Sequence, residues 1–505
     1  MKQAIAAAFV LSAYVVVPQA EAQAIQNIVL RNSFSPIGVG ARGLGMGGAF
    51  IAVADDGTAA SFNPAGLAQL RRTELAIVGF TDELTSTLFV PKGGTEVETT
   101  QNKVRHSALD FGGMAIPFEV GGRNLTIQLS YQRAVDMFGK GQATIQDTIN
   151  LSELDPTLKG TGTFVADVTP QQAGAFHTVN LSAGYQATSR LALGVTFNYW
   201  TADWTAQGSD NFRLRVKAPR GTVDVPLLST HFDQQQSMRA WSVNTGFLLK
   251  YPWLSIGGIL RLPFNGYYNL KENDSSIAFD DQGQPLPALA DQFAVTSRLY
   301  WPRSAGVGVA LRPFKGLTLA GDFTRSYWSQ ATLSNVPAGA LLTPTKTGPT
   351  GAREDTFNDR NFFDLLPSST TSTNDTNAWH GGGEYLVVLP HLIVPLRGGI
   401  FRDRSPIAEL GTDLGRQTRG WTAGIGLNFS RLVLDFAFER RQSEGIVSLR
   451  LQRGQTPQTG GIALSSENVK QDRLVASAIY RFGGDDDPLK RAFRFLFGGP
   501  KEEGN

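Results

Sequence analysis

The feature that most constrains this chain is an alternation of apolar and polar residues that recurs in long runs from about residue 73 onward. The stretch RGWTAGIGLNFS, for example, puts Trp421, Ile425 and Phe429 on one face and small or polar residues such as Thr422 on the other. A period of two is the side-chain period of a β-strand. The alternation therefore predicts an all-β protein.

The runs are also long and numerous. Each covers ~10 to 14 residues, whereas a sandwich strand averages ~5 to 6 and a tilted strand that crosses hydrocarbon needs ~9 to 11. We count fourteen runs, an even number as in bacterial transmembrane barrels. They begin near Thr73, Val104, Arg123, Ala175, Arg190, Met238, Trp253, Asp291, Gly316, Asn377, Leu392, Thr418, Arg431 and Asp472. We therefore predict a closed antiparallel transmembrane β-barrel of about 14 strands over residues 73–484.

The links between the runs alternate in length. The short links lie at 119–122, 187–190, 251–252, 312–315, 389–390 and Ser430, and the long polar ones at 139–172, 205–236, 333–375 and 445–470. Short periplasmic turns and long outer loops are typical of outer-membrane barrels. The pairs Tyr199-Trp200, Tyr300-Trp301 and Tyr327-Trp328 stand at run ends, where they are interpreted as interfacial aromatic girdles.

The N-terminus has the pattern of an export signal. Lys2, the apolar run 4–17 and the small-residue pattern around Ala22 predict a signal peptide over residues 1–24. The chain has no cysteine, so no disulfide holds the exported fold. A net charge of +2 gives no sign of a nucleic-acid partner.

Catalytic chemistry finds little support in the sequence. The five histidines are scattered without the spacing of a metal site, and no G-x-S-x-G motif is present. Asp435 and Glu439 are interpreted as inward-facing residues that form lumenal ion pairs with Arg441. We expect no catalytic residue, no metal and no cofactor.

Between the signal peptide and the barrel, residues 25–72 show no sustained period of two. Gly38, Gly40 and Gly43 match the G-x-G-x-x-G spacing of a nucleotide loop, but that motif needs a strand before it and an exported chain meets no nucleotide pool. The alternative is a plug, because apolar residues such as Phe50 and Ile51 would be buried inside a lumen. We predict a lumenal hatch over 25–72.

The C-terminal tail, residues 485–505, leaves two interpretations open. Within DPLKRAFRFLFGG, Leu489, Phe493 and Phe497 share one side at helical spacing, which would suit a short helix on the periplasmic leaflet. A disordered periplasmic tail is the other interpretation.

Together, three groups of residues resemble the FadL-type long-chain fatty-acid transporters. They are the segment GLGMGGAFIAVADDGTAASFNPAGLAQL with its Asn63-Pro64-Ala65, the strand NAWHGGGEYLVV, and the strands PLRGGIFRDRSPI and RGWTAGIGLNFSRLVLDFAFER. The resemblance covers most of the mature chain, but it is patchy over 205–300 and 333–375.

The resemblance implies a mechanism and candidate residues. Ligand would be captured in an apolar lumenal pocket and would leave sideways beside a kinked third strand, with hatch rearrangement coupling the steps. By that analogy Phe62, Asn63, Pro64 and Ala65 belong to the hatch element that faces the pocket. The third strand ends in YQRAVDMFGKG, where Asp136, Gly139 and Gly141 mark the lateral gate.

The preferred function is therefore passive uptake of hydrophobic compounds, such as long-chain fatty acids, across the outer membrane. The expected partners are such lipophiles together with outer-membrane lipid and lipopolysaccharide, and the expected state is a monomer. Two alternatives stay open at this point: an assembly or shuttle component for exported proteins, and an outer-membrane lipid hydrolase.

Overall fold

A computed structural model describes residues 38–91, 97–153, 159–218, 221–280, 282–337, 357–361, 373–408, 415–450 and 462–483 of the 505-residue chain. The predicted signal peptide, residues 25–37 of the predicted hatch and the C-terminal tail lie outside the described residues. No helix among the described residues has the length and apolar character needed to cross a membrane.

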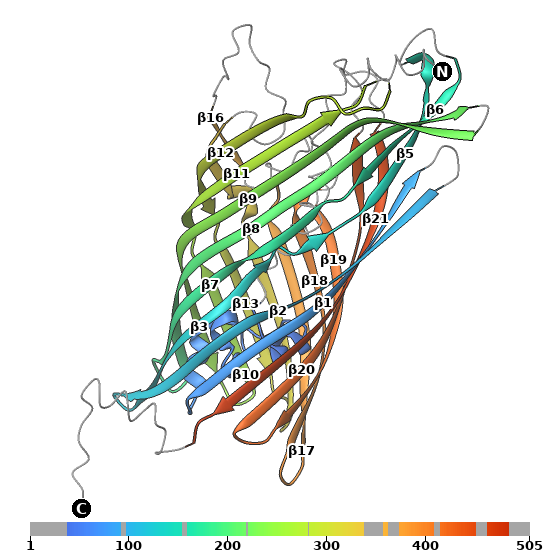
Figure 1. Cartoon of the computed structure of the whole chain (residues 1–505). Helices are drawn as coiled ribbons and strands as arrows, with labels where there is room; N and C mark the ends of the chain where they lie inside the picture. The colour runs from blue at the N-terminus through green and yellow to red at the C-terminus, as the bar shows by residue number, and fades with distance from the viewer. Residues whose placement is uncertain are drawn as a thin grey trace, which may run out of the picture.

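The described strands form a closed antiparallel barrel (Figure 1). Closure comes from β1 (Glu74–Pro91), which pairs with β2 (Val97–Val120) on one side and with β21 (Ile462–Arg481) on the other. Some strands continue one another end to end across a short break. We call each single strand, or each pair of strands joined in this way, a stave, and the wall has 14 staves. An even count with both chain ends of the barrel on one side is typical of outer-membrane barrels, which confirms the predicted fold.

The staves follow chain order. The first half comprises β3 (Arg123–Asp136) continued by β4 (Gly139–Lys140), β7 (Gln171–Gln186), β8 (Leu191–Ala218), β9 (Gly221–Lys250), and β10 (Leu254–Arg261) continued by β11 (Phe264–Ala278). Next come β12 (Leu289–Trp301) with β13 (Ser304–Leu311), β14 (Leu317–Ser326) with β15 (Thr332–Pro337), and β16 (Phe357–Asn361) with β17 (Thr376–Val388). The last are β18 (Ile393–Ala408), β19 (Gly415–Asn428), β20 (Leu432–Arg450) and β21.

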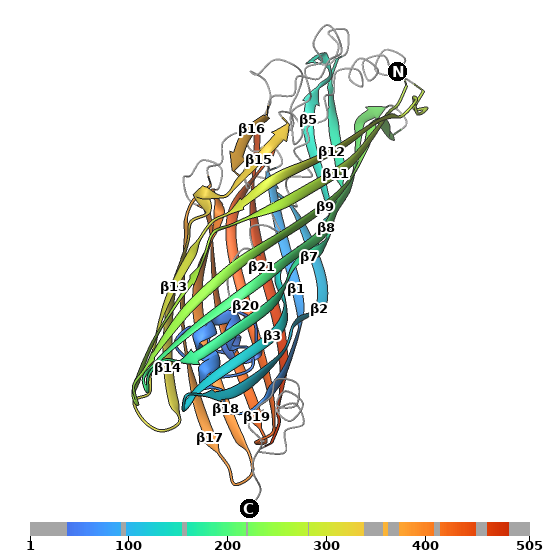
Figure 2. The same cartoon turned by 90° about the vertical axis from the view of Figure 1, so that its left-hand side faces the viewer.

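Beyond these staves, β5 (Ala143–Asn150) and β6 (Thr161–Val168) form a hairpin that pairs with β8. The hairpin stands at one end of the barrel, where it extends past the rim (Figure 1). Strands at the opposite end are joined by short turns, such as the one between β17 and β18 (Figure 2).

Most predicted strands begin within a few residues of the observed ones, and all six predicted short turns are confirmed. The predicted loop at 205–236 is wrong, because β8 and β9 remain paired through most of it. Strands also occupy parts of 139–172 and 445–470. The ladder continues past the membrane, whereas the apolar alternation ends with the hydrocarbon, so the sequence pattern marks only the membrane-facing part of each strand.

Exposed apolar side chains form a belt around the outside of the barrel's lower half. Its members include Ile77, Leu129, Leu181, Phe197, Phe247, Val309, Leu319, Ile400, Ile425 and Leu474. Each lies on the outward face of its strand and alternates with buried or small lumenal residues. A continuous apolar belt on a closed barrel is the surface that a bilayer covers.

We predict that a charge in this belt destabilises the barrel. Leu181→Lys should lower the free energy of unfolding by about 2–4 kcal/mol, because the ammonium would lie in hydrocarbon. Urea unfolding in lipid vesicles measures it. Gln207→Lys, on an exposed β8 position above the belt, is the control and should change little. Equal effects of the two substitutions would place the bilayer elsewhere on the barrel.

Candidate functional site

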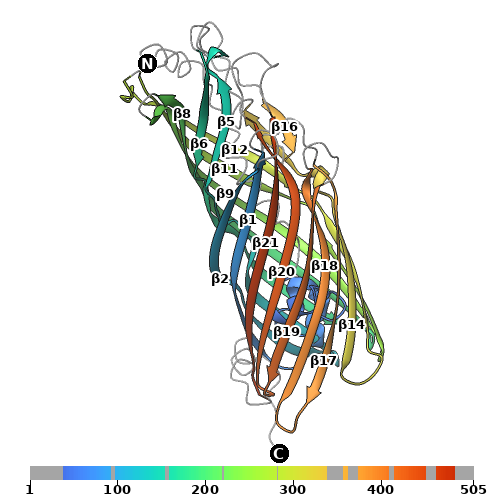
Figure 3. The same ribbon diagram turned by 90° about the vertical axis from the view of Figure 1, so that its right-hand side faces the viewer.

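Residues 38–72 lie inside the lower half of the barrel; we call them the lumenal segment (Figures 2 and 3). The segment contains three short helical turns: α3 (Ala41–Gly45), α4 (Ala59–Phe62) and the 3-10 helix η1 (Pro64–Gln69). Nearly all of its side chains are buried, including Phe50, Ala54 and Leu67. Its apolar residues fill the lumen at the level of the belt.

The three glycines of the G-x-G-x-x-G match are explained by packing within the lumenal segment. A Cβ at Gly38 or at Gly43 would lie 2.5 Å from the ring of Phe62. Gly40 has a φ of 125°, which favours glycine, and a Cβ there would meet the Thr58 hydroxyl at 2.8 Å. Phe62 in turn packs edge-on against Phe50, with ring centroids 5.0 Å apart. These glycines make room for an aromatic ring, so the nucleotide-loop interpretation is not supported.

The wall carries glycines where the lumenal segment touches it. A Cβ at Gly194 of β8 would lie 2.2 Å from the Ala65 nitrogen, and one at Gly399 of β18 would lie 2.3 Å from the Gly47 nitrogen. Equivalent close approaches occur at Gly184, Gly246, Gly257, Gly308, Gly382 and Gly424. The segment is therefore docked backbone against backbone, from several sides of the barrel at once.

Buried charges fasten the same segment. Arg42 of α3 binds Glu384 of β17 through two hydrogen bonds of 3.0 Å and reaches Asp55 at 2.6 Å. Glu384 also accepts a bond from Arg397, which binds Asp435 at 2.6 Å. Asp435 is lumenal as predicted, but its partner is Arg397, and of the two predicted carboxylates only Glu439 pairs with Arg441. Burial acts to lower the pKa of Arg42, but Asp55, Glu384 and Asp56 together raise that pKa well above its usual value. Arg42 stays charged, and the cluster ties the segment to the wall.

Asn63, Pro64 and Ala65 lie on the side of the segment that faces β8 and β9. The Asn63 amide donates to the carbonyls of Ile51 and Phe247, both at 2.9 Å, and its oxygen accepts from the Ala65 nitrogen at 3.1 Å. All three residues are fully or almost fully buried. They anchor the segment to the wall, and the cavity described below is instead lined by Ala60 and Ser61.

We predict that a methyl group at the docking surface loosens the lumenal segment. Gly194→Ala should cost about 1–3 kcal/mol of stability, because its Cβ overlaps the Ala65 backbone. Limited proteolysis of the segment in the assembled barrel measures the loosening. Gly112→Ala is the matched control, since a Cβ at Gly112 meets nothing within 4 Å. Equal protease resistance in both variants would argue against a tight backbone contact.

Above the lumenal segment lies a cavity of about 110 Å³. Its lower wall is polar, with Ser130 and Gln132 on β3, Thr178, Asn180 and Ser182 on β7, Thr196 and Asn198 on β8, and Ser242 and Asn244 on β9. Several of these groups already bind one another: Asn198 donates to the Ser242 hydroxyl at 3.0 Å, and Thr196 donates to the Ser182 hydroxyl at 2.9 Å.

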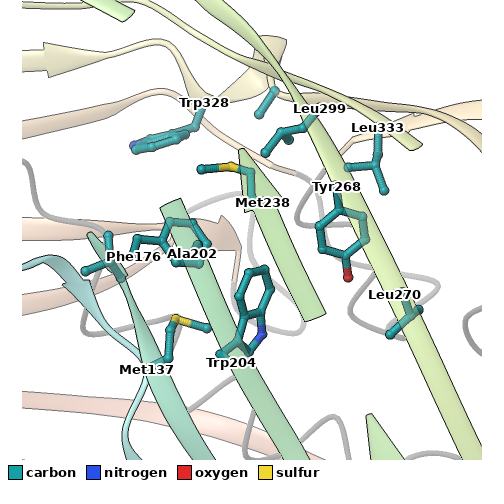
Figure 4. Packing of buried hydrophobic residues seen from close by; sticks show 12 residues of the cluster. Met137, Phe176, Ala202, Trp204, Met238, Tyr268, Leu270, Leu299, Trp328 and Leu333 are labelled. Atoms are coloured by element: carbon teal, nitrogen blue, oxygen red, sulfur yellow. The ribbon is translucent and has the colours of Figure 1, made fainter. Parts of the chain in front are cut away.

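The upper wall of the cavity is aromatic. We define the aromatic cluster as Phe176, Trp200, Trp204, Phe264, Tyr268, Trp301 and Trp328, of which four line the cavity: Trp200, Phe264, Trp301 and Trp328. Trp301 is central, because its ring centroid lies within 5.1–6.1 Å of the rings of Trp328, Trp200, Phe264 and Phe176. Figure 4 shows Phe176, Trp204, Met238, Tyr268 and Trp328 packing inside the barrel.

The girdle interpretation of the three Tyr-Trp pairs was half wrong. In each pair the tryptophan, Trp200, Trp301 or Trp328, lines the cavity. Tyr199 packs at a tilt against exposed Trp241 outside, and Tyr327 lies under Arg303 and Arg325. Adjacent residues of a strand point to opposite faces, so only one member of a pair can face lipid. The same alternation that predicted the barrel could have found these cavity residues.

Charge in the cavity lining has one sign. Arg261 and Arg303 line it, and none of the described residues that line it is a carboxylate. Several lumenal carboxylates elsewhere are engaged in ion pairs, such as Glu439 with Arg441 and Glu467 with Arg416. A polar site with two cationic side chains and no carboxylate favours a neutral or anionic ligand.

The third stave is interrupted near the predicted gate residues. The β2–β3 ladder ends at Phe111 and Gln132, while β3 above that level pairs with β7 alone among the described residues. Asp136 accepts from Arg133 at 2.6 Å and lies 3.5 Å from His106, whose ring stacks on Phe138. Gly139 pairs with Gln172 of β7, and the Gly141 nitrogen donates to the Pro170 carbonyl. These residues stay paired to β7 as the stave departs from β2, and their gating role remains a prediction.

Among the described residues, no group of three or more His, Asp or Glu side chains could hold a metal ion. The cavity lining combines hydroxyl, amide, aromatic, aliphatic and guanidinium groups, a mixture that suits an organic ligand.

Comparison with known proteins identifies the fold. No protein-family model matches the sequence, and no curated protein matches it either. Among solved structures, a Pseudomonas aeruginosa FadL homologue is similar with a TM-score of 0.55, at 15% identity, over 89% of this chain and 100% of that one. The P. putida toluene transporter TodX is similar with a TM-score of 0.50, at 14% identity, over 89% of this chain and 100% of that one. By their descriptions the first is a FadL homologue and the second a toluene transporter.

Proposed function

We propose that this chain, which has the fold of the FadL-type barrels, is a monomeric outer-membrane channel for passive uptake of hydrophobic compounds. The observation that carries the proposal is the cavity between the docked lumenal segment and the aromatic cluster. Its apolar upper wall holds a lipophile, and its polar lower wall orients one polar end. Both features are typical of a small-molecule binding site.

The size of the cavity bears on the substrate. An apolar cavity of about 150 Å³ is known to hold benzene. At about 110 Å³, the cavity fits a molecule on the scale of one aromatic ring or a short alkyl segment. We therefore propose small lipophiles as the substrates, with longer fatty acids entering only as the wall or the cluster rearranges.

The lumenal segment acts as the hatch of this channel. It fills the lumen at the level of the belt, so water and ions have no open pore there. A lipophile gains ~0.8 kcal/mol for each CH₂ it buries, whereas a hydrated ion gains nothing from an aromatic wall. The channel thus selects lipophiles over ions because it excludes water and buries the apolar surface of the ligand.

Departure from the cavity is sideways. The docked segment blocks the axial path, with Arg42, Asn63 and the wall glycines holding it in place. The end of the β2–β3 ladder, beside Asp136, Gly139 and Gly141, is the lateral gate that the family resemblance predicts. The outer-membrane lipid and lipopolysaccharide around the belt receive the cargo.

We predict that the aromatic cluster contributes to affinity. Trp200→Ala should weaken toluene binding about 2- to 13-fold, because one aromatic contact contributes ~0.5–1.5 kcal/mol. Titration calorimetry on detergent-solubilised protein measures the change. The control is Trp241→Ala, which removes an exposed ring on the outer face. Unchanged affinity in Trp200→Ala, or an equal loss in the control, would remove the cluster from the binding site.

We also predict that Asn63 couples the hatch to uptake. Asn63→Ala leaves the carbonyls of Ile51 and Phe247 without their donor, which costs about 1–3 kcal/mol. Uptake of radiolabelled toluene by cells that lack such a channel should change, while heat-modifiable electrophoretic mobility shows that the barrel is still assembled. Asn265→Ala, at an exposed β11 position, should leave uptake as in the wild type.

A further inference from the structure

Two prolines face each other in the wall beside the cavity. Arg261 is the last residue of β10 and pairs with Ser304 of β13, while Phe264 is the first of β11 and pairs with Trp301 of β12. The two pairs are three residues apart on both strands, so the register does not shift between them. Pro263 therefore lies opposite Pro302. Proline has no N–H to donate. Residues 262–263 and 302–303 belong to neither ladder.

The next stave is interrupted at the same level. Ser326, the last residue of β14, pairs with Ser304 and is followed by Tyr327 and the 3-10 turn η3 (Trp328–Gln330). Pairing resumes in β15, where Thr332 faces Tyr300 of β12. The ladder is thus interrupted in three neighbouring staves at one height, which we call the wall break. Two backbone bonds remain there, from Leu262 to the Val243 carbonyl of β9 and from Tyr327 to the Arg303 carbonyl, but neither joins the two proline-bearing staves to each other.

The break coincides with the upper edge of the apolar belt. Below it the exposed residues are apolar, with Leu260 on β10 and Val307 on β13. Above it they are polar or interfacial, with Tyr267 on β11 and Arg298 on β12. On β10 the outward side chains have even residue numbers, and on β11 they have odd ones. The alternation therefore switches faces at the break, as it does at a β-bulge. The break meets the boundary between hydrocarbon and headgroups.

The break also borders the cavity. Leu262, Phe264, Trp301, Pro302 and Arg303 all line it. Leu262 is at the same time 38% exposed, so one side chain contributes to both the cavity and the accessible surface. Arg303 lies with its guanidinium 4.6 Å from the centre of the Tyr327 ring.

The opening beside β3 has a different chemistry. There His106 and Arg133 contact Asp136, and Arg473 lies 3.6 Å from Asp110 and 3.4 Å from Asp82. An apolar molecule that crossed this cluster would separate charges from their partners, which is costly in a low-dielectric lumen. At the wall break it would instead contact Leu262, Phe264 and Trp301.

We propose that the wall break is a second side port, through which an apolar ligand passes between the cavity and the outer leaflet. This inference rests on the proposed uptake function. The opposed prolines leave the two staves without ladder bonds at this point, so parting them breaks few hydrogen bonds. Leu262 and the rings of Phe264 and Trp301 give the passing ligand apolar contact throughout.

A disulfide staple tests the port, because the chain has no cysteine of its own. Leu262→Cys with Arg303→Cys places one thiol on each strand of the break. The matched control is Ile256→Cys with Val309→Cys, a register pair in the intact ladder of the same two staves. Uptake of radiolabelled toluene by cells that lack such a channel is compared before oxidation, after oxidation and after reduction.

The staple at the break should lower uptake on oxidation and restore it on reduction, while the control pair keeps uptake throughout. Mass spectrometry verifies that the disulfide has formed. If uptake stays intact with the disulfide formed, the side port is refuted and the proposed uptake function is not. A wild-type protein without uptake overturns the proposed function and the port together.

A second variant needs no disulfide. Pro263→Val with Pro302→Val restores two N–H donors to the ladder and should lower uptake. Uptake at the wild-type level in this variant contradicts the port. A further disulfide, Asn102→Cys with Gln142→Cys, closes the gate beside β3, because the Gln142 nitrogen donates to the Asn102 side chain of β2 in the wild type. If this disulfide abolishes uptake and the disulfide at the break does not, the proposal is overturned.

Discussion

The rest of this structure depends on the need to pair every backbone polar group that lies in hydrocarbon. The ladder between β1 and β21 meets that need by joining the first and last staves, so no strand edge is left facing lipid. A closed barrel of 14 staves encloses a lumen too wide for wall side chains alone to fill. The lumenal segment fills its lower half.

The lumenal segment packs its backbone, rather than bulky side chains, against the barrel wall. This packing requires particular residues in both the segment and the wall. Wall glycines such as Gly194 and Gly399 bring strands to within contact of Ala65 and Gly47, and Phe62 occupies the space left by Gly38 and Gly43. Buried pairs such as Arg42 with Glu384 then fix one orientation of the segment. The cavity persists above it because the aromatic cluster lines the wall without closing the lumen.

The fold was predictable from the sequence because lipid imposes one repeating rule, and Trp421, Ile425 and Phe429 follow it openly. The apolar alternation ends where the hydrocarbon ends. Residues 205–236, which extend β8 and β9 beyond it, therefore have the sequence pattern of a loop. The sequence marks Asn63 only through the family resemblance, because its contacts with Phe247 and Ile51 depend on long-range docking that no local pattern encodes. Strand alternation places Trp200 and Trp301 on the lumenal face, whereas their position at run ends predicts an interfacial girdle. The opposition of Pro263 and Pro302 required the register between two distant strands.

The central claim is that the cavity between the lumenal segment and the aromatic cluster holds a small lipophile. An experimental structure of the protein equilibrated with a brominated benzene tests it most directly, because anomalous scattering locates the bromine. The account predicts a bromine peak among Trp200, Phe264, Trp301 and Ser182, with Arg42 and Asn63 still bound to the wall. Bromine peaks only on the outer belt, with the cavity empty, would contradict it.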